Sequence, residues 1–215
     1  MPLEVLTSEA ARLAPVLCGA LSASPFTLAG GTGLAVQLGH RVSVDFDWFI
    51  RPEAFPRGLA ERLTATGLPI EIIQDSADTF ECALSGVKCS FFAFGPTFAP
   101  PDIRLHGLPV APVPDIGAMK LIAVSQRGAR KDFHDLYEIL KKLDLRALAL
   151  RLRVMYARSL PNPVHLAKSL VYFADAEGEP EPRMLTGVHW PEVKQFFSDH
   201  VRNHTDALLG ELATP

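Results

Sequence analysis

The chain has few of the residues that build disulfide frameworks or metal clusters. Its 215 residues include three cysteines, Cys18, Cys82 and Cys89, and these form no CxxC pair. Neither a disulfide framework nor a zinc cluster is therefore expected. Among the seven histidines only His200 and His204 have HxxxH spacing, and no HExxH motif is present, which removes the common zinc-protease motif.

Long apolar runs are also missing. No stretch approaches the roughly 20 apolar residues that a membrane-spanning helix needs. The first four residues, Met1 to Glu4, show neither a basic segment nor a clear apolar one, so no signal peptide is indicated. We therefore expect a cytoplasmic protein.

The chain lacks the strong positive charge of a general nucleic-acid binder. Its formal net charge is −3. Hydrophobic residues make up 48% of the chain and charged residues 21%, a composition that is typical of a folded globular protein. The charge is uneven, because residues 127–158 carry nine Lys or Arg against four Asp or Glu, whereas both flanking segments are net acidic. This basic segment is either a solvated helix face or a local surface for phosphates or RNA.

The first half of the chain predicts a small mixed α/β unit. Strands are expected over 26–29, 42–49, 70–74, 79–84 and 87–94, and helices over 7–21, about 32–38 and within 52–66. The Ser85-Gly86 turn predicts a hairpin between the last two strands. Segment 42–49 alternates strictly, which places Val44, Phe46 and Trp48 on one face and the polar residues on the other.

The second half has apolar spacing near 3.6 and is expected to be helical. The predicted helices cover 115–126, 131–143, 145–158, 163–173 and 190–209, with a polar loop at 176–182. We therefore predict an α+β fold with a mixed sheet in an α/β domain over 1–112, followed by a helical domain over 113–215.

Gly30-Gly31-Thr32 lies between a predicted strand and a predicted helix. Two glycines there allow a tight turn and close approach of a ligand, and the amide groups at a helix start suit a phosphate. Such turns also occur for packing alone. The segment is neither a P-loop nor a GxGxxG motif.

Asp45 and Asp47 lie on one face of the predicted strand 42–49. Their Cα atoms would be roughly 7 Å apart, from a rise of about 3.4 Å per residue. Two such carboxylates repel each other unless a cation lies between them, and Mg²⁺ prefers oxygen ligands. The alternative is a solvated polar face. A glycine turn beside two metal-binding acids is what phosphoryl and nucleotidyl transfer require.

The stretch LAGGTGLAVQLGHRVSVDFDWF, residues 28–49, resembles the first motif of the nucleotidyltransferase superfamily with the DNA polymerase β fold. More narrowly, it resembles the AbiEii/AbiGii toxin branch of bacterial abortive-infection and toxin–antitoxin systems. A second resemblance lies in DIGAMKLIAVSQRGARKDFHDLYEIL, residues 115–140. The remainder of the chain matches this family only in the order of its elements.

The resemblance implies an NTP substrate, Mg²⁺ as cofactor, and transfer of a nucleoside monophosphate, or of short nucleotide stretches, to an acceptor. In relatives of this branch the acceptor is often RNA, notably tRNA, and a separate antitoxin protein is usual. The implied metal ligands are Asp45 and Asp47. The implied nucleotide-binding residues are Gly30, Gly31, Thr32, Ser43, Lys120 and Arg127, and the implied catalytic set is Asp45, Asp47, Lys120, Asp132 and Asp135. The NTP is expected in a cleft between the two domains.

The residues of the second motif support these roles in part. Lys120 and Arg127 are seven apart and share a helix face if the helix extends that far, although Gly128 is expected to break it. Asp132 and Asp135 share a face at the start of the next helix, where acids also favour the helix dipole. Lys120 could equally be a surface lysine with a buried stem.

The sequence departs from the superfamily at the third carboxylate. Many members place it on a later strand, in a KxD-like pattern, and here Ser90 occupies the matching position. Glu71 or Glu81 on neighbouring predicted strands could substitute. Otherwise the site works with two acids, or it is degenerate and the protein binds nucleotide or a partner protein without turnover. Adenylylation of an antibiotic is a third hypothesis.

Other residues are expected to be structural. His40 is expected in a turn, His134 on a helix surface and Cys89 in the interior. The run Phe91, Phe92, Phe94 and Phe98 is expected to be core, or cover for the helical domain, rather than a platform for bases.

Overall fold

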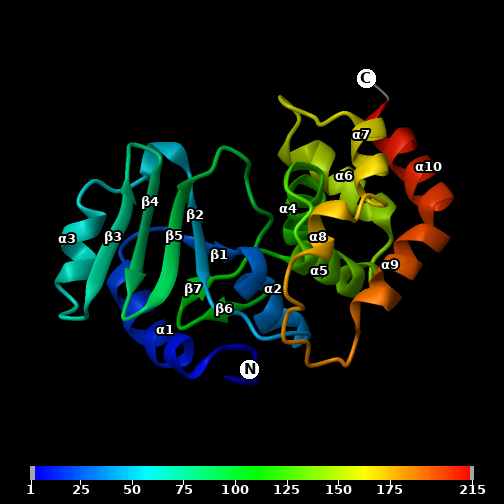
Figure 1. Ribbon diagram of the computed structural model, residues 1–215. Coiled ribbons are helices and arrows are strands. Elements are labelled where there is room, and N and C mark those ends of the chain that lie inside the picture. The colour runs from blue at the N-terminus through cyan, green and yellow to red at the C-terminus, as the bar shows by residue number, and fades with distance from the viewer. Residues whose placement is uncertain (1–2, 214–215) are drawn as a thin grey trace. The chain divides into compact units, whose positions relative to one another are not determined.

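The computed structural model describes residues 3–213. The chain divides into two compact units, Met1–Pro112 and Val113–Pro215. The first contains the strands and the second contains helices, which confirms the α+β class (Figure 1). No helix within residues 3–213 is both long enough and apolar enough to cross a bilayer.

A five-stranded mixed sheet organises the first unit (Figure 1). Its strands are β1 (Thr27–Ala29), β2 (Phe46–Ile50), β3 (Ile70–Asp75), β4 (Thr79–Leu84) and β5 (Val87–Ala93), in the order β1-β2-β5-β4-β3. The β2–β5 pair is parallel, and the other neighbours are antiparallel. The predicted hairpin is present, with positive φ at Ser85 and Gly86 as a tight hairpin turn requires. A small separate hairpin joins β6 (Arg104–Leu105) to β7 (Leu108–Pro109).

The helices of the first unit are η1 (Leu3–Val5), α1 (Ser8–Leu21), α2 (Gly30–Leu38), η2 (Pro52–Ala54) and α3 (Leu59–Thr64). Of these, α1 and α3 contribute apolar side chains to the core on one face of the sheet. The side chain of Thr7 caps α1 by accepting a hydrogen bond from the amide of Ala10. Phe46, Trp48, Phe80 and Phe91 pack with α1 and α3 in the core. The alternate residues of the central strands, which include Asp47 and Ser90, therefore point to the opposite face.

The segment before β2 differs from the prediction. The strand begins at Phe46 rather than Val42, and the side chain of Val44 is 60% exposed. The prediction that Val44 shares the core face was wrong. The physical reason lies at Ser43, which is buried, forms an isolated bridge with Leu6 and donates its amide to the carbonyl of Val5 at 2.8 Å. With Ser43 turned inward, its neighbour Val44 must turn out.

The second unit packs around α4 (Val113–Gln126). The other helices are α5 (Arg130–Leu140), α6 (Leu145–Met155), α7 (Pro163–Ser169), α8 (Ala174–Glu177), α9 (Trp190–Asp199) and α10 (Val201–Leu212). Helix α4 contacts α5, α6 and α7, and α10 contacts α6 and α7. The single helix predicted over 190–209 is two helices, because the backbone at His200 leaves the helical region. The short α8 extends into the predicted polar loop.

Candidate functional site

The first turn of α2 lies directly against the carboxylate of Asp47. Helix α2 begins at Gly30, so both glycines belong to its first turn rather than to a preceding loop. Gly30 has a φ of +60°, and a Cβ added there would lie 2.2 Å from Asp47 Oδ2. Only glycine accepts both the left-handed backbone and this distance. The carboxylate is therefore held beside the amide groups that open the helix.

Gly31 makes the corresponding close approach to Arg41. A Cβ at Gly31 would lie 2.3 Å from Arg41 Nη2 and 3.4 Å from Ser43 Oγ. Arg41 is 5% exposed and donates from Nη1 to the carbonyl of Val42 at 3.2 Å. A buried guanidinium thus lies beside the start of α2. No pattern in the sequence predicted a role for Arg41, although it lies within the stretch 28–49 that resembles the first family motif.

Thr32 and Ser43 lie inside the unit and face each other. Thr32 Oγ1 contacts Ser43 Oγ at 2.7 Å and also the carbonyl oxygen of Asp45, and both side chains are buried. These contacts fix the backbone that carries Asp45 relative to α2.

Asp45 and Asp47 are half-buried and flank Phe46, the first residue of β2. Ala29, the residue before α2, has a methyl side chain and cannot cap the helix amides. No group of three or more His, Cys, Asp or Glu side chains suited to a metal occurs within residues 3–213. Two carboxylates still fit Mg²⁺, because this ion is usually held by one or two carboxylates together with substrate phosphates and water.

Ser90 stands beside Asp47 on the neighbouring strand. The register pairs Asp47 with Ser90 across β2 and β5, and Ser90 with Glu81 across β5 and β4. Ser90 Oγ donates to Glu81 Oε1 at 3.0 Å, and Lys88 Nζ lies 3.2 Å from the same oxygen. Asp47, Ser90 and Glu81 therefore lie side by side in register across β2, β5 and β4, and we call them a row. Glu71 lies one strand further away, on the edge strand β3.

Cys89 is buried, as predicted, and is unsuited to nucleophilic chemistry. A hydrogen bond with Cys82, burial, and negative charges that include Asp47 and Asp45 all raise the pKa of the Cys89 thiol above its usual range. A thiol with a raised pKa keeps its proton at neutral pH and is a poor nucleophile.

In the second unit, the predicted residues form one buried ionic cluster. Lys120 Nζ lies 2.7 Å from Asp132 Oδ1 and 2.6 Å from Asp135 Oδ2. Arg127 makes a two-point contact with Asp132, at 2.7 Å from Nε and 3.0 Å from Nη2. Both carboxylates are fully buried and Lys120 is 5% exposed, so Lys120 is not a surface lysine.

The two cations keep the carboxyl group of Asp132 ionised. Burial raises its pKa, but the charges of Lys120 and Arg127 and their hydrogen bonds outweigh that effect, so the pKa of Asp132 lies below its ordinary value. Gly128 has a φ of +56° in the turn between α4 and α5. This turn brings Arg127, the residue after α4, into contact with Asp132 in the first turn of α5.

Much of the basic segment 127–158 is paired within its own unit. Arg151 binds the buried Asp115, Arg146 binds Glu211, and Lys141 Nζ lies 3.2 Å from Glu138 Oε2. The guanidinium of Arg130 donates to the carbonyls of Ala176 and Glu177. The local excess of positive charge is therefore partly neutralised by these acidic groups and carbonyls.

The sequence predicts the location of two histidines, and one of these predictions was wrong. His134 is fully buried, with its ring 5.9 Å from that of Trp190, so the prediction of a surface residue was wrong. The cause is the packing of α9 against α5, which covers that face of α5. His40 does lie in the connection after Gly39, but it is 1% exposed.

Comparison with known proteins identifies the class as a nucleotidyltransferase. The sequence model of one protein family, the AbiEii nucleotidyl transferase toxins of type IV toxin–antitoxin systems, matches residues 88–208. The chain is also 36% identical over 186 residues to the uncharacterised protein aq_aa25 of Aquifex aeolicus (strain VF5), covering 84% of this chain and 88% of that protein. The chain belongs to the AbiEii family of toxin nucleotidyltransferases, which confirms the resemblance seen in the sequence.

Solved structures share the fold at low sequence identity. A candidate nucleotidyltransferase from H. pylori superposes with a TM-score of 0.58 at 18% identity, covering 93% of this chain and 94% of that chain. MenT4, a nucleotidyltransferase toxin of Mycobacterium tuberculosis H37Rv, superposes with a TM-score of 0.54 at 16% identity, covering 93% and 84%. These likenesses confirm the nucleotidyltransferase fold.

The contact between Gly30 and Asp47 generates a first prediction. Gly30→Ala would displace the Asp47 carboxylate, and we expect transfer of label from a radiolabelled NTP to fall at least about tenfold. Gly39→Ala is the matched control, because Gly39 has a similar φ of +66° with nothing within 4 Å of the added Cβ. Both variants should lose about 1–2 kcal/mol of stability from left-handed backbone strain. Equal activity of the two variants would show that the close approach is dispensable.

The ionic cluster generates a second prediction, on stability. Lys120→Met leaves two carboxylates buried beside the lost cation, and the free energy of unfolding in urea at pH 7 should fall by about 3–5 kcal/mol. The control is Lys141→Met, since Lys141 is 43% exposed and its pair with Glu138 should contribute no more than about 1 kcal/mol. Equal effects of the two substitutions would contradict the buried cluster.

The lowered pKa of Asp132 adds a pH dependence. A carboxyl group with a pKa lower in the folded than in the unfolded chain stabilises the fold fully above its unfolded value. That contribution disappears as the pH falls through the lower folded value. The natural chain should therefore lose stability in acid more steeply than the Asp132→Asn chain, as measured by urea unfolding from pH 7 to acid pH.

Proposed function

We propose that this nucleotidyltransferase uses Mg²⁺ to move a nucleoside monophosphate from an NTP to an RNA acceptor such as tRNA, acting as the toxin partner of a separate antitoxin protein. The observation that carries the proposal is the contact of the α2 turn with Asp47. It holds a carboxylate suited to Mg²⁺ beside the backbone amides of a helix start, and those amides suit a phosphate.

The residues of the first unit have distinct roles in this proposal. The amides at Gly30 and Gly31 bind the triphosphate, and the guanidinium of Arg41 adds positive charge near the same turn. Asp45 and Asp47 would hold the ion. Thr32 and Ser43 position the backbone of Asp45 instead of touching the nucleotide with their hydroxyl groups.

The reaction itself is an in-line displacement. The acceptor hydroxyl attacks the α-phosphorus of the NTP, the bond to the β-phosphate breaks and pyrophosphate leaves. A bound Mg²⁺ would neutralise charge on the reacting phosphates. The backbone amides of the α2 turn hold the leaving group, and Asp45 and Asp47 fix where the reacting phosphate lies.

Lys120 would neutralise phosphate charge, and Asp132 and Asp135 would orient it. The ammonium group is held by both carboxylates at 2.7 and 2.6 Å, and Asp132 is itself held by Arg127. An ammonium group fixed in this way loses little further freedom when it meets a phosphate.

Ser90 favours a second candidate function, in which the protein binds nucleotide or a partner protein without turnover. The serine stands where the register would place a third acid beside Asp47. Isothermal titration with an NTP and Mg²⁺, run beside a pyrophosphate-release assay, separates the two candidates. Tight binding without pyrophosphate release would favour the second.

A third prediction tests the two metal-binding acids. The double variant Asp45→Asn with Asp47→Asn should reduce transfer of label from α-labelled NTP to total tRNA by about a thousandfold, because several kcal/mol of charge stabilisation are lost. The matched control is Asp75→Asn with Asp78→Asn, which makes the same charge change at the exposed β3–β4 turn. Unchanged labelling in the first double variant would refute the role of Asp45 and Asp47.

The same assay identifies the class of acceptor. Total tRNA and aminoglycosides are offered separately with each of the four NTPs. Label on tRNA supports the proposal, whereas label on the drug alone would replace RNA by a small-molecule acceptor.

A fourth prediction concerns Glu81. If this carboxylate, held by Ser90, takes the part of the third acid and receives the acceptor proton, Glu81→Gln should lower kcat by about 10²–10⁴ and leave NTP affinity unchanged. Glu71→Gln on the neighbouring strand is the control and should keep full activity. Full activity of both variants would show that Glu81 is not the third acid and that the site uses Asp45 and Asp47 alone.

A further inference from the structure

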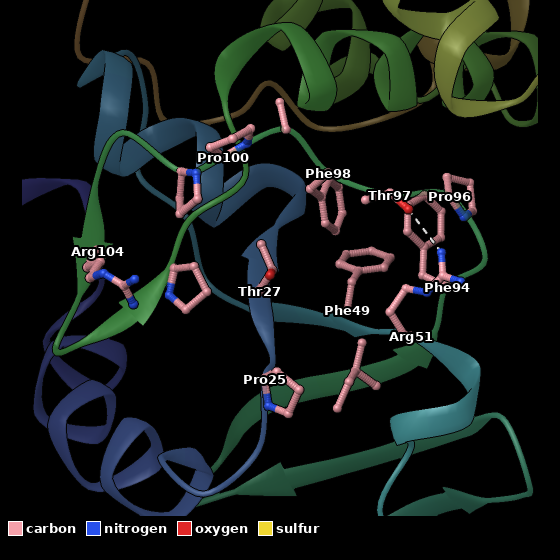
Figure 2. A pocket seen from close by; sticks show the side chains of 14 residues that line it. Pro25, Thr27, Phe49, Arg51, Phe94, Pro96, Thr97, Phe98, Pro100 and Arg104 are labelled. Atoms are coloured by element: carbon pink, nitrogen blue, oxygen red, sulfur yellow. Dashed lines mark hydrogen bonds between the residues drawn. The ribbon is translucent and has the colours of Figure 1, made fainter.

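An open cavity of about 410 Å³ lies in the first unit, and the proposed function has not used it. Its lining includes β1, β2, the β6–β7 hairpin and the proline-rich segment that follows β5 (Figure 2). The volume falls in the range of small-molecule sites, which is about 300–1,000 Å³. A flat ring the size of a nucleobase therefore has room in it.

Aromatic rings form one wall of this cavity. The ring of Phe49 lies 5.2 Å from that of Phe94 and 6.0 Å from that of Phe98, while Phe94 and Phe98 stack at 5.2 Å. Figure 2 shows Phe98 next to Phe49, with Phe94 on the same side of the cavity. These three rings are half-buried, whereas Phe91 is fully buried. Phe91 is core as predicted, but Phe94 and Phe98 line an open cavity instead.

Two arginines line the cavity. In Figure 2, Arg51 lies next to Phe94, whereas Arg104 lies apart from the rings, on the left of the view. Arg51 is fixed by hydrogen bonds from Nη1 to the carbonyl of Gly95 at 2.8 Å and to Thr97 Oγ1 at 2.9 Å. Arg104 is exposed and donates to the carbonyl of Gly107 at 2.9 Å. Aromatic rings beside guanidinium groups are the combination that binds single-stranded nucleic acid, through base stacking and phosphate contacts.

The cavity lies on the same strand and the same sheet face as the metal-binding acid. Phe49 follows Asp47 by two residues, which corresponds to about 7 Å along a strand. The register pairs Asp47 with Ala29 and Phe49 with Thr27, so Gly30 lies on the opposite side of Asp47 from Phe49. Along β2, the order is therefore phosphate-binding turn, metal-binding acid, aromatic cavity.

This order matches an in-line transfer. Pyrophosphate leaves toward the turn that holds it, so the acceptor hydroxyl must approach the α-phosphorus from the other side. That is the side on which the cavity lies. We propose that the cavity binds a nucleobase at the reacting end of a single-stranded RNA acceptor, with Phe98 and Phe49 stacking the base and Arg104 contacting a phosphate. This inference rests on the proposed function.

A fifth prediction tests this site by binding alone. A fluorescein-labelled single-stranded RNA hexamer is titrated with the full chain, without NTP or Mg²⁺, and anisotropy is recorded. Phe98→Leu should weaken binding between about fivefold and a hundredfold, because stacking is lost while the apolar volume is kept. Phe98→Tyr should restore binding. The control is Phe55→Leu, a half-buried phenylalanine of the same unit outside the cavity.

A second variant tests the phosphate contact. Arg104→Gln should reduce the slope of log affinity against log salt concentration by about 0.7, the amount expected for one phosphate contact on a single strand. NTP affinity, measured by titration with Mg²⁺, should be the same in the natural, Phe98→Leu and Arg104→Gln chains.

The outcomes separate this inference from the proposed function. Three results would each overturn the cavity assignment without affecting the test of Asp45 and Asp47. They are unchanged RNA affinity of Phe98→Leu, failure of Phe98→Tyr to restore RNA binding, and a loss of NTP affinity instead of RNA affinity in Phe98→Leu. Loss of RNA binding by Phe98→Leu together with full labelling by the Asp45→Asn, Asp47→Asn chain would keep the cavity and refute the metal-binding acids. A natural chain that binds no RNA would overturn the cavity assignment and the RNA acceptor together.

Discussion

The close approach of the α2 turn to the carboxylate of Asp47 is the constraint on which the rest of the site depends. A side chain at Gly30 would occupy the place of the carboxylate, and one at Gly31 would occupy the place of the Arg41 guanidinium. The buried contact between Thr32 and Ser43 then holds the segment before β2 in register with the helix. Backbone amides, a guanidinium and two carboxylates are thereby brought together by packing rather than by neighbouring positions in the sequence.

The helical unit contains charge where helical packing alone would place apolar residues. Burying an ion pair costs desolvation free energy, and a well-packed apolar replacement is often equally stable or more stable. Lys120, Asp132 and Asp135 are nevertheless buried together, and the more exposed Arg127 forms an ion pair with Asp132 at the edge of the cluster. Buried charges of this kind occur at functional sites and also in structural ion-pair networks.

The face of the sheet that carries Asp47 combines the chemical features of the first unit. Asp47, Ser90 and Glu81 form a row across three neighbouring strands, and Phe49 leads from that row into the aromatic cavity. The opposite face is filled by the apolar core with α1 and α3. This division follows from the two-residue period of strands, which lets β2 present Phe46 and Trp48 to the core and Asp47 and Phe49 to the opposite face.

The sequence by itself determined the α+β class, the β4–β5 hairpin, most helices, and the two motifs that indicate the family, because these depend on local periodicity and on residues close together in the chain. The inward turn of Ser43, the place of Arg41 beside Gly31, the burial of His134 and the break at His200 were decided by the tertiary structure alone. So was the cavity, whose walls come from segments far apart in the sequence. A side chain's surroundings depend on which distant segments pack against it, and no local pattern of residues contains that information.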